Sequence, residues 1–571
     1  MPMEWSAKNR PHILECMARE TFDVLVIGGG ITGAGVAREA ALRGLRVALV
    51  ERRDFAVGTS SRSSKLIHGG LRYLAQGDIS LVREAARERA VLRRLAPHLA
   101  EPMQMLVPVY SRTGCLTIRA GLFTYDRLAK VNPEERNRML SREEVLSIEP
   151  LLRAERLYGG GLYYEYLTDD ARLVIETVKS AVALGALAIN DAPVVRLHLE
   201  GGQVAGAFVR DATTGSEFLV RARAVINAAG PWVDDIRLMQ NGGEQRRLHL
   251  TKGIHLTLPR QRLPVGRCVV MHAADKRSVF VIPHGDLVYL GTTDTDYDGP
   301  REEPVISVAD AEYLLAAANA AFAIEPLKLH EIVGAWAGLR PLLHEEGRKP
   351  SEISRKDEIM IGPTGLISIA GGKLTTFRCM AQRILEAAAL RIGAERAPTP
   401  RGTSEAAPLY GGDFGAAGDT GVELALQRFH DRLHSQYPQG SHAVVGRLVR
   451  LYGTNAETIL ARLSADPTLA EEADDHSGLT RAEVEYTLAE EMAQTLTDVL
   501  ERRTRLFLWD RNLGQHAAPR VASWMAQWLG WDSARQQAEV EAYLHHVHEV
   551  TTFIPAHPGM QAREAHAPSG S

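Results

Sequence analysis

A glycine-rich turn between an apolar strand and a helix constrains the fold of this chain more than any other feature. Residues 23–51 read DVLVIGGGITGAGVAREAALRGLRVALVE, a pattern that predicts strand, turn, helix and strand. Gly28, Gly30 and Gly33 form the motif G-x-G-x-x-G, and Glu51 ends the second strand 23 residues after the first glycine. Such glycines permit a tight turn and close approach to a pyrophosphate, and the acid can accept hydrogen bonds from a ribose. The segment predicts a dinucleotide-binding unit; a turn that binds nothing is the weaker interpretation.

NAD and FAD sites share this motif, and three features favour FAD. The unit lies at the N-terminus of a long chain, as expected where many later segments enclose one ligand. Residues 193–230 predict a three-strand meander that ends in INAAG, a recurrent insert in flavoproteins built on two dinucleotide-type folds. The sequence has no second G-x-G-x-x-G unit, which argues against a separate nicotinamide domain.

Composition narrows the function classes. The chain has 571 residues, too many for one simple core, with 45% apolar and 24% charged residues, as in ordinary soluble proteins. Its net charge of −4 gives no global basic field for nucleic acid, so an anionic partner needs a local cationic cluster. A homodimer is compatible with the sequence, which does not specify the oligomeric state.

The cysteines and the apolar segments indicate the compartment. Four cysteines, Cys16, Cys115, Cys268 and Cys379, lie far apart without metal-ligand spacing, which indicates free thiols in a reducing compartment. The N-terminus is polar and charged, and the chain contains no apolar run of about 18 residues. We therefore expect a cytoplasmic protein, or one bound to a membrane from one side.

Two later glycine motifs resemble cofactor contacts. Residues 226–236, INAAGPWVDDI, predict a buried strand that ends in small residues, where a cofactor could approach; a simple tight turn is nearly as good an interpretation. In AGGKLTTFR, residues 370–378, two glycines precede a helix start that carries Lys373. A lysine there opposes the helix dipole, so the position favours an anion site over an ordinary capped helix.

Together these motifs resemble one family. IGGGITGAG, SSKLIHGGLRYL, INAAGPWVDD, GTTD, GLRPLL and GGKLTTFR occur in this order as in the FAD-dependent glycerol-3-phosphate dehydrogenases. The resemblance covers roughly residues 20 to 550 and implies a two-dinucleotide-binding-type α/β flavoprotein, with a sheet-containing substrate domain and an α-helical C-terminal domain. SSKLIHGGLRYL is the most specific motif.

The resemblance implies a division of the chain. The FAD-binding domain is expected over 20–85, 166–245 and 330–395, and the substrate domain over 86–165 and 246–329. A linker is expected over 396–412, a helical domain over 413–553 and a disordered tail over 554–571. Cofactor contacts are expected from Gly28, Gly30, Gly33, Glu51, Thr59, Ser60, Ser64, Lys65, Leu66, Gly230, Gly372, Leu374 and Thr375.

The substrate site follows from the same resemblance. The loop over residues 58–74 contains the motif SSKLIHGGLRYL. Its second half, from His68 to Tyr73, would pass beside the flavin ring and present Arg72 and Tyr73 to the substrate. Arg340 and Lys373 would complete a cluster of three cations around a phosphomonoester, because arginine forks suit phosphate oxygens and lysine acts as a point charge. His255 is the first choice as catalytic base, and Arg340 or Lys373 would assist by stabilising charge.

The predicted activity is the oxidation of sn-glycerol 3-phosphate to dihydroxyacetone phosphate. The carbon-2 hydrogen would leave as a hydride to flavin N5, and the electrons would pass to a membrane quinone, as the resemblance implies. One alternative is an oxidase of the same fold that uses oxygen, or an amine-oxidising relative, which would not need a phosphate clamp. Another is a flavin-bound structural or regulatory protein, which the three cations argue against.

A quinone acceptor requires contact with lipid. The sequence predicts a basic helix over 79–99, and we consider it as a docking surface on the inner face of the cytoplasmic membrane. The helix carries apolar Leu81, Val82, Leu92 and Leu95 and cationic Arg83, Arg87, Arg89, Arg93 and Arg94. An ordinary cover helix whose arginines face water is an equally good interpretation.

Overall fold

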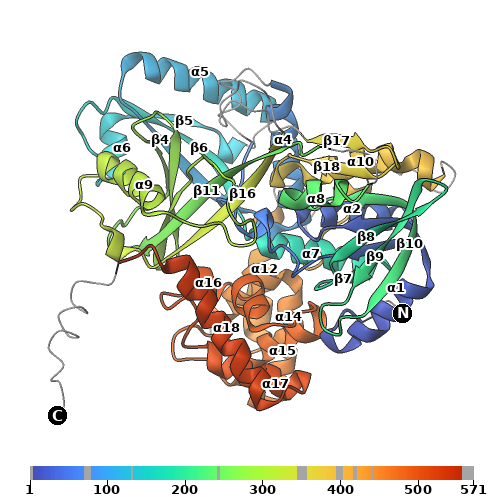
Figure 1. The fold of residues 1–571 in the computed structure, drawn as a ribbon. Helices are drawn as coiled ribbons and strands as arrows, with labels where there is room; N and C mark the ends of the chain where they lie inside the picture. Colours follow the sequence, from blue (N-terminus) through green and yellow to red (C-terminus); the bar gives the residue numbers. More distant parts are fainter. Residues whose placement is uncertain are drawn as a thin grey trace, which may run out of the picture.

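The chain folds into two sheet-based halves and a helical C-terminal domain (Figure 1). A computed structural model describes residues 4–69, 79–129, 133–240, 245–343, 357–393, 403–415, 421–438 and 442–555. In Figure 1 the N-terminal dinucleotide unit and the C-terminal helices lie side by side, with the second sheet beside both.

The first sheet is built around the glycine motif. Its order is β17-β18-β10-β1-β2-β7, and β8 and β9 extend it from β10 as the predicted antiparallel meander. The strands are β1 Thr21–Ile27, β2 Val47–Val50, β7 Leu187–Ile189, β8 Val194–Glu200, β9 Gln203–Arg210, β10 Glu217–Asn227, β17 Glu358–Ile361 and β18 Ile367–Ala370. β1 pairs in parallel with both β2 and β10, and all but one of its residues are buried, which explains the continuous apolar run at 24–27.

Helices cover this sheet. They are α1 Arg10–Arg19, α2 Ile31–Leu42, α7 Asp170–Ala183, α8 Val233–Arg237 and α10 Phe377–Ile392. α2 follows the glycine turn and packs between α7 and α10, so nearly all of its residues are buried. The alanines and glycines of α2 allow this close packing on two sides.

The second sheet carries the expected substrate region. Its order is β15-β11-β14-β13-β12-β4-β6-β3, with β16 paired to β11 and β5 paired to β6. The strands are β3 Leu66–Ile67, β4 Glu101–Val109, β5 Arg138–Ser141, β6 Gly159–Leu167, β11 Leu248–Pro259, β12 Cys268–His272, β13 Ser278–His284, β14 Leu287–Gly291, β15 Thr295–Asp296 and β16 Gly334–Leu343. β16 falls inside the expected FAD segment 330–395 yet pairs in this second sheet. The domain division itself stays a prediction.

Four helices pack on the second sheet or connect it to the first half. They are α4 Ile79–Leu95, α5 Arg112–Ala129, α6 Arg142–Ile148 and α9 Val308–Ala321. The predicted helix over 79–99 is α4 followed by a short 3-10 turn at Pro97–Leu99. Leu81, Val82, Leu92 and Leu95 are all buried, and the Arg89 guanidinium lies 2.8 Å from Glu165 in a buried ion pair. The structure thus corrects the suggestion that α4 docks to a membrane: its apolar face belongs to the protein core.

The region after the linker is helical, as the sequence predicts. It contains α12 Val422–Gln436, α13 His442–Tyr452, α14 Ala456–Ala465, α15 Arg481–Glu490, a π-helix at Asp498–Arg503, α16 Leu506–Trp509, α17 Ala518–Leu529 and α18 Ser533–Thr551, while the short helix α11 Thr403–Ala406 falls inside the expected linker 396–412. All four cysteines are free, as predicted. Across the described ranges no helix combines the length and the apolar character needed to cross a membrane.

Candidate active site

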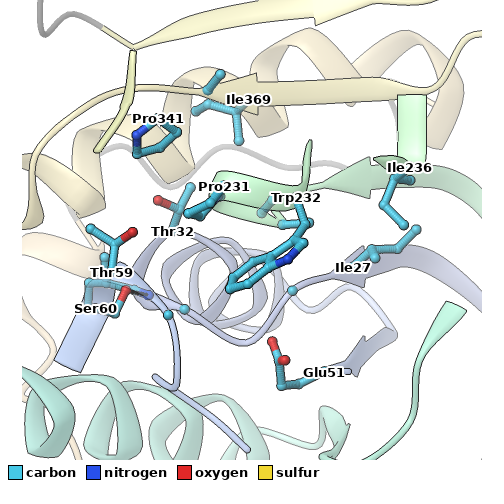
Figure 2. Close-up of a pocket in the computed structure, with 18 of the residues that line it drawn as sticks. Ile27, Thr32, Glu51, Thr59, Ser60, Pro231, Trp232, Ile236, Pro341 and Ile369 are labelled. Carbon is cyan, nitrogen blue, oxygen red and sulfur yellow. Dashed lines mark hydrogen bonds between the residues drawn. The ribbon is translucent and has the colours of Figure 1, made fainter. Parts of the chain in front are cut away.

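A deep pocket opens where β1, β10 and β18 end (Figure 2). The turn after β1 requires glycine, because Gly28 has φ +109° and an added Cβ would lie 2.6 Å from the carbonyl oxygen of Ala228. Gly33 serves helix packing, since a Cβ on it would lie 1.8 Å from the carbonyl oxygen of Gly28. Gly30 and the first turn of α2 line the pocket and direct the positive end of the helix toward it.

Glu51 and Ser60 define two sides of this pocket, as Figure 2 shows. Both carboxylate oxygens of Glu51 accept backbone hydrogen bonds, from Gly29 N at 2.6 Å and from Arg53 N at 2.9 Å. Burial raises the pKa of Glu51, and these two amides oppose that shift. The Ser60 hydroxyl accepts a hydrogen bond from Ile31 N at 3.0 Å, which fixes the loop over the start of α2. The site therefore joins a rigid acid, a helix N-terminus and a hydroxyl-bearing loop.

Most of the predicted cofactor contacts lie on the pocket wall. Of the predicted residues, Gly28, Gly30, Glu51, Thr59, Ser60, Gly230, Gly372 and Leu374 line it, as does Lys373. Trp232, Pro231 and Ile236, which the sequence did not single out as contacts, form a further part of the wall (Figure 2). The turn at 228–232 that follows β10 is the signal that could have identified the first two.

Three loop residues and Thr375 lie elsewhere. Lys65 is 1% exposed, and its ammonium contacts both carboxylate oxygens of Asp170 at 2.8 Å. Burial lowers the pKa of Lys65 to about 8 despite the attraction of Asp170. Leu66 lies in the core, and Thr375 is buried against the backbone of His68, with 3.4 Å between its hydroxyl and the His68 carbonyl oxygen. The structure thus places Lys65 in a buried ion pair and not, as expected, on the pocket wall, because its partner Asp170 is distant in the sequence.

Ser64 contacts the predicted base. Its hydroxyl lies 2.8 Å from Nε2 of His255, whose ring is 2% exposed and stacks on Trp336 at 4.8 Å. Nδ1 of His255 is buried and has no hydrogen-bond partner among the residues that the structure describes. Burial, with the positive charges of Lys65 and Arg340, holds the pKa of His255 well below its ordinary value. His255 is therefore neutral near pH 7, the form that a general base requires.

Arg340 lies on the strand next to His255. β11 and β16 pair in antiparallel register, and Pro341, which follows Arg340, lines the pocket. The Arg340 guanidinium lies 3.0 Å from Asp294 and 3.1 Å from the hydroxyl of Thr292. These contacts hold the guanidinium in place while leaving part of it exposed. Two further predicted substrate residues, Arg72 and Tyr73, lie outside the described residues.

The residues present fit FAD. The turn with Gly28 supplies an open cradle at the helix N-terminus, Glu51 lies where a ribose would be held, and the pocket continues past Ser60 to Lys373. A dinucleotide-type sheet with this pocket, joined to a second, mixed sheet whose strand β16 contributes Pro341 to the pocket wall, defines a flavoprotein oxidoreductase.

Comparison with known proteins agrees with this class. Residues 23–378 match the family described as FAD dependent oxidoreductase, and residues 403–536 match the C-terminal domain of alpha-glycerophosphate oxidase. The aerobic glycerol-3-phosphate dehydrogenase of Bacillus subtilis (strain 168) is 39% identical over 547 residues, 95% of this chain and 97% of that protein. The aerobic glycerol-3-phosphate dehydrogenase of Staphylococcus haemolyticus (strain JCSC1435) is also 39% identical, over 94% of this chain and 96% of that protein.

A solved structure extends the match to three dimensions. The glycerol-3-phosphate dehydrogenase from Bacillus halodurans, complexed with FAD, superimposes with a TM-score of 0.80 and 34% identity, over 97% of this chain and all of that one. The chain therefore belongs to the FAD-dependent glycerol-3-phosphate dehydrogenase family.

Proposed function

We propose that this protein uses FAD to oxidise sn-glycerol 3-phosphate to dihydroxyacetone phosphate. The observation that carries the proposal is the placement of buried His255 and of Arg340 on the paired strands β11 and β16, with Arg340 directly before Pro341, which lines the pocket that fits FAD. The full-length similarity to proteins named aerobic glycerol-3-phosphate dehydrogenase supports the same substrate. Anaerobic addition of this substrate to the FAD-loaded protein, with flavin absorbance as the signal, tests the proposal.

His255 would remove the proton of the carbon-2 hydroxyl. Its Nδ1 atom lacks a partner among the described residues, so it is the nitrogen that can accept this proton. In that role the neutral ring carries its own proton on Nε2, and Nε2 then donates to the Ser64 hydroxyl at 2.8 Å. Bound FAD supplies the hydride acceptor. The Ser64 hydroxyl can donate or accept, so its contact is compatible with this tautomer and helps to hold the ring in place.

Arg340 and Lys373 would hold the phosphate. The phosphomonoester carries nearly two negative charges, and Arg340 already has its orientation fixed by Asp294. Asp294 offsets part of the positive charge, so Lys373 on the pocket wall would supply the balance. Arg72 remains the third predicted cation of this cluster.

A membrane quinone is the acceptor that we propose, with the protein on the inner face of the cytoplasmic membrane. A quinone stays in lipid, so the protein must dock there without spanning it. The similarity to proteins named aerobic dehydrogenases supports this acceptor. Oxygen is the alternative, favoured by the match of the C-terminal region to a domain of alpha-glycerophosphate oxidase.

We propose helix α5 as the surface that docks to anionic lipid. Leu116 and Phe123 are 63% and 57% exposed on it. Arg112, Arg119 and Arg127 are exposed on the same helix, and within its described part the exposed residues include no acid. Figure 1 shows α5 at the outer edge of the second sheet, away from the C-terminal helices. Large exposed apolar side chains flanked by cations are typical of helices that lie in a membrane interface.

We expect that replacing Arg112, Arg119 and Arg127 together by glutamine will abolish flotation with anionic liposomes at low salt. The loss follows from the attraction of about 1 kcal/mol that each cation near an anionic surface contributes. The matched control replaces Arg196, Arg210 and Arg223, whose side chains are 54%, 51% and 44% exposed on the first sheet, and should float like the wild type. Equal flotation of both variants would remove α5 from the docking surface. A wild-type protein that never floats, with a flavin reoxidised by oxygen but not by short-chain quinones, would favour the oxidase.

A further inference from the structure

The segment Ser61–Lys65 is held directly against His255. Besides the contact from Ser64 to Nε2, Tyr289 donates its hydroxyl proton to the Ser64 carbonyl at 3.0 Å, and Trp336 Nε1 donates to the Ser63 carbonyl at 3.1 Å. Trp336 is the ring on which His255 stacks. The position of Ser64 therefore determines how the imidazole is oriented.

Asp170 fixes the same segment from the other side. Its Oδ2 atom accepts from the Ser63 backbone at 3.0 Å and from the Ser63 hydroxyl at 2.7 Å, in addition to both contacts with Lys65. Asp170 is fully buried at the start of α7. Lys65 adopts a left-handed backbone, with φ +58°, that only surrounding contacts can hold. This carboxylate therefore maintains the shape of the segment that carries Ser64.

Arg505 of the C-terminal domain completes the group. Its Nη2 atom donates to Oδ1 of Asp170 at 3.0 Å and its Nε atom donates to Asp169 at 2.8 Å. The side chain is 1% exposed and lies between the π-helix and α16. A continuous series of contacts thus runs from Arg505 through Asp170 and the Ser63–Lys65 backbone to Ser64 and His255.

We propose that Arg505 is a positioning residue for the reaction, through which the C-terminal helical domain holds the Ser63–Lys65 segment and so sets the orientation of His255. The inference rests on the role of His255 under the proposed function. It gives the C-terminal domain a part in catalysis, although none of its residues lines the cofactor pocket among the residues described.

Arg503 provides a matched control. It is also buried and is the last residue of the π-helix. Its guanidinium reaches the first half of the molecule, where it contacts Asp54 at 2.7 and 2.8 Å. Within the described part of the chain its hydrogen bonds and ion pairs go to Asp54 and Glu491 and not to the segment that carries Ser64, and Asp54 keeps Arg502 as a second partner. Replacing Arg503 removes a comparable buried ion pair at the same interface without touching the proposed series of contacts.

The test compares Arg505→Met and Arg503→Met in the FAD-loaded protein. In Arg505→Met, hydrogen–deuterium exchange of residues 59–67 should rise relative to β1, and flavin reduction at saturating sn-glycerol 3-phosphate should fall by about tenfold to a hundredfold. Substrate affinity and FAD content should stay near wild type. Arg503→Met should change neither the exchange of residues 59–67 relative to β1 nor the reduction rate.

A double-mutant cycle separates positioning from general stability. Arg505→Lys, which keeps the charge and is less disruptive, should recover part of the rate, and combining it with Ser64→Ala should give less than the product of the two single effects. Independent effects, or equal loss in Arg503→Met and Arg505→Met, would overturn the proposal. If His255→Asn leaves the rate unchanged while Arg505→Met still loosens residues 59–67, the role of His255 fails and the contact series alone stands.

Discussion

Replacing His255 with asparagine is expected to slow flavin reduction by sn-glycerol 3-phosphate by about a hundredfold or more. The asparagine amide can still contact Ser64, but it cannot take a proton from the substrate hydroxyl. Because burial and two nearby cations hold the pKa of His255 well below its ordinary value, the wild-type base stays deprotonated in the free enzyme as pH falls through 6.5. Anaerobic stopped-flow absorbance at saturating substrate measures this step directly.

The control for His255 lies on the same strand. His249 contacts Asp296 at 2.7 Å near the surface end of β11, and His249→Asn should reduce the flavin at the wild-type rate. An unchanged rate in His255→Asn would give His255 a structural role and direct attention to Arg340 or to an ordered water as the base.

Replacing Arg340 with methionine is expected to lower kcat/KM. The loss of transition-state stabilisation should be about 2–4 kcal/mol, the cost of removing one partner of a largely desolvated charged contact. The FAD content should change less than kcat/KM, because Pro341 lines the pocket and Arg340 itself does not. Lys373 lines the pocket itself, so Lys373→Met should cost a similar amount and lower the FAD content more.

Asp294 complicates this experiment, since Arg340→Met leaves its carboxylate without that ion pair. The double variant Arg340→Met with Asp294→Asn also removes this carboxylate charge and should retain the low kcat/KM. Arg262→Met, which breaks the surface ion pair with Glu331 in the same half of the molecule, serves as the control. Wild-type kinetics in both Arg340 variants would remove this arginine from the site.

The dinucleotide fold could be predicted because its signals are local. The glycine spacing of residues 28–33, the apolar strands on either side and Glu51 all lie within one strand–helix–strand unit. The meander that leads into β10 and the helical C-terminal region also follow from periodicity over short segments. Each of these features depends on residues that are close in the sequence.

The parts that the sequence did not predict depend on distant partners. Lys65 reads as a phosphate ligand in its loop, but Asp170, 105 residues away, binds its ammonium in the core. The arginines of α4 resemble a lipid-binding face in the sequence, but Arg89 forms a buried ion pair with Glu165 on β6, which is distant in the chain. The exposure of this face of α5 could not be predicted from the sequence either, because its leucine and phenylalanine would fit a core helix just as well.

Anaerobic reduction of the bound flavin shows whether sn-glycerol 3-phosphate is the substrate. The purified, FAD-loaded protein is mixed anaerobically with sn-glycerol 3-phosphate, and the visible flavin band is followed with time. We expect the band to bleach in a single turnover and dihydroxyacetone phosphate to form in equal amount to the flavin reduced, whereas glycerol without the phosphate should leave the band unchanged. A flavin that stays oxidised with the phosphate ester, or that glycerol reduces equally well, would contradict this expectation.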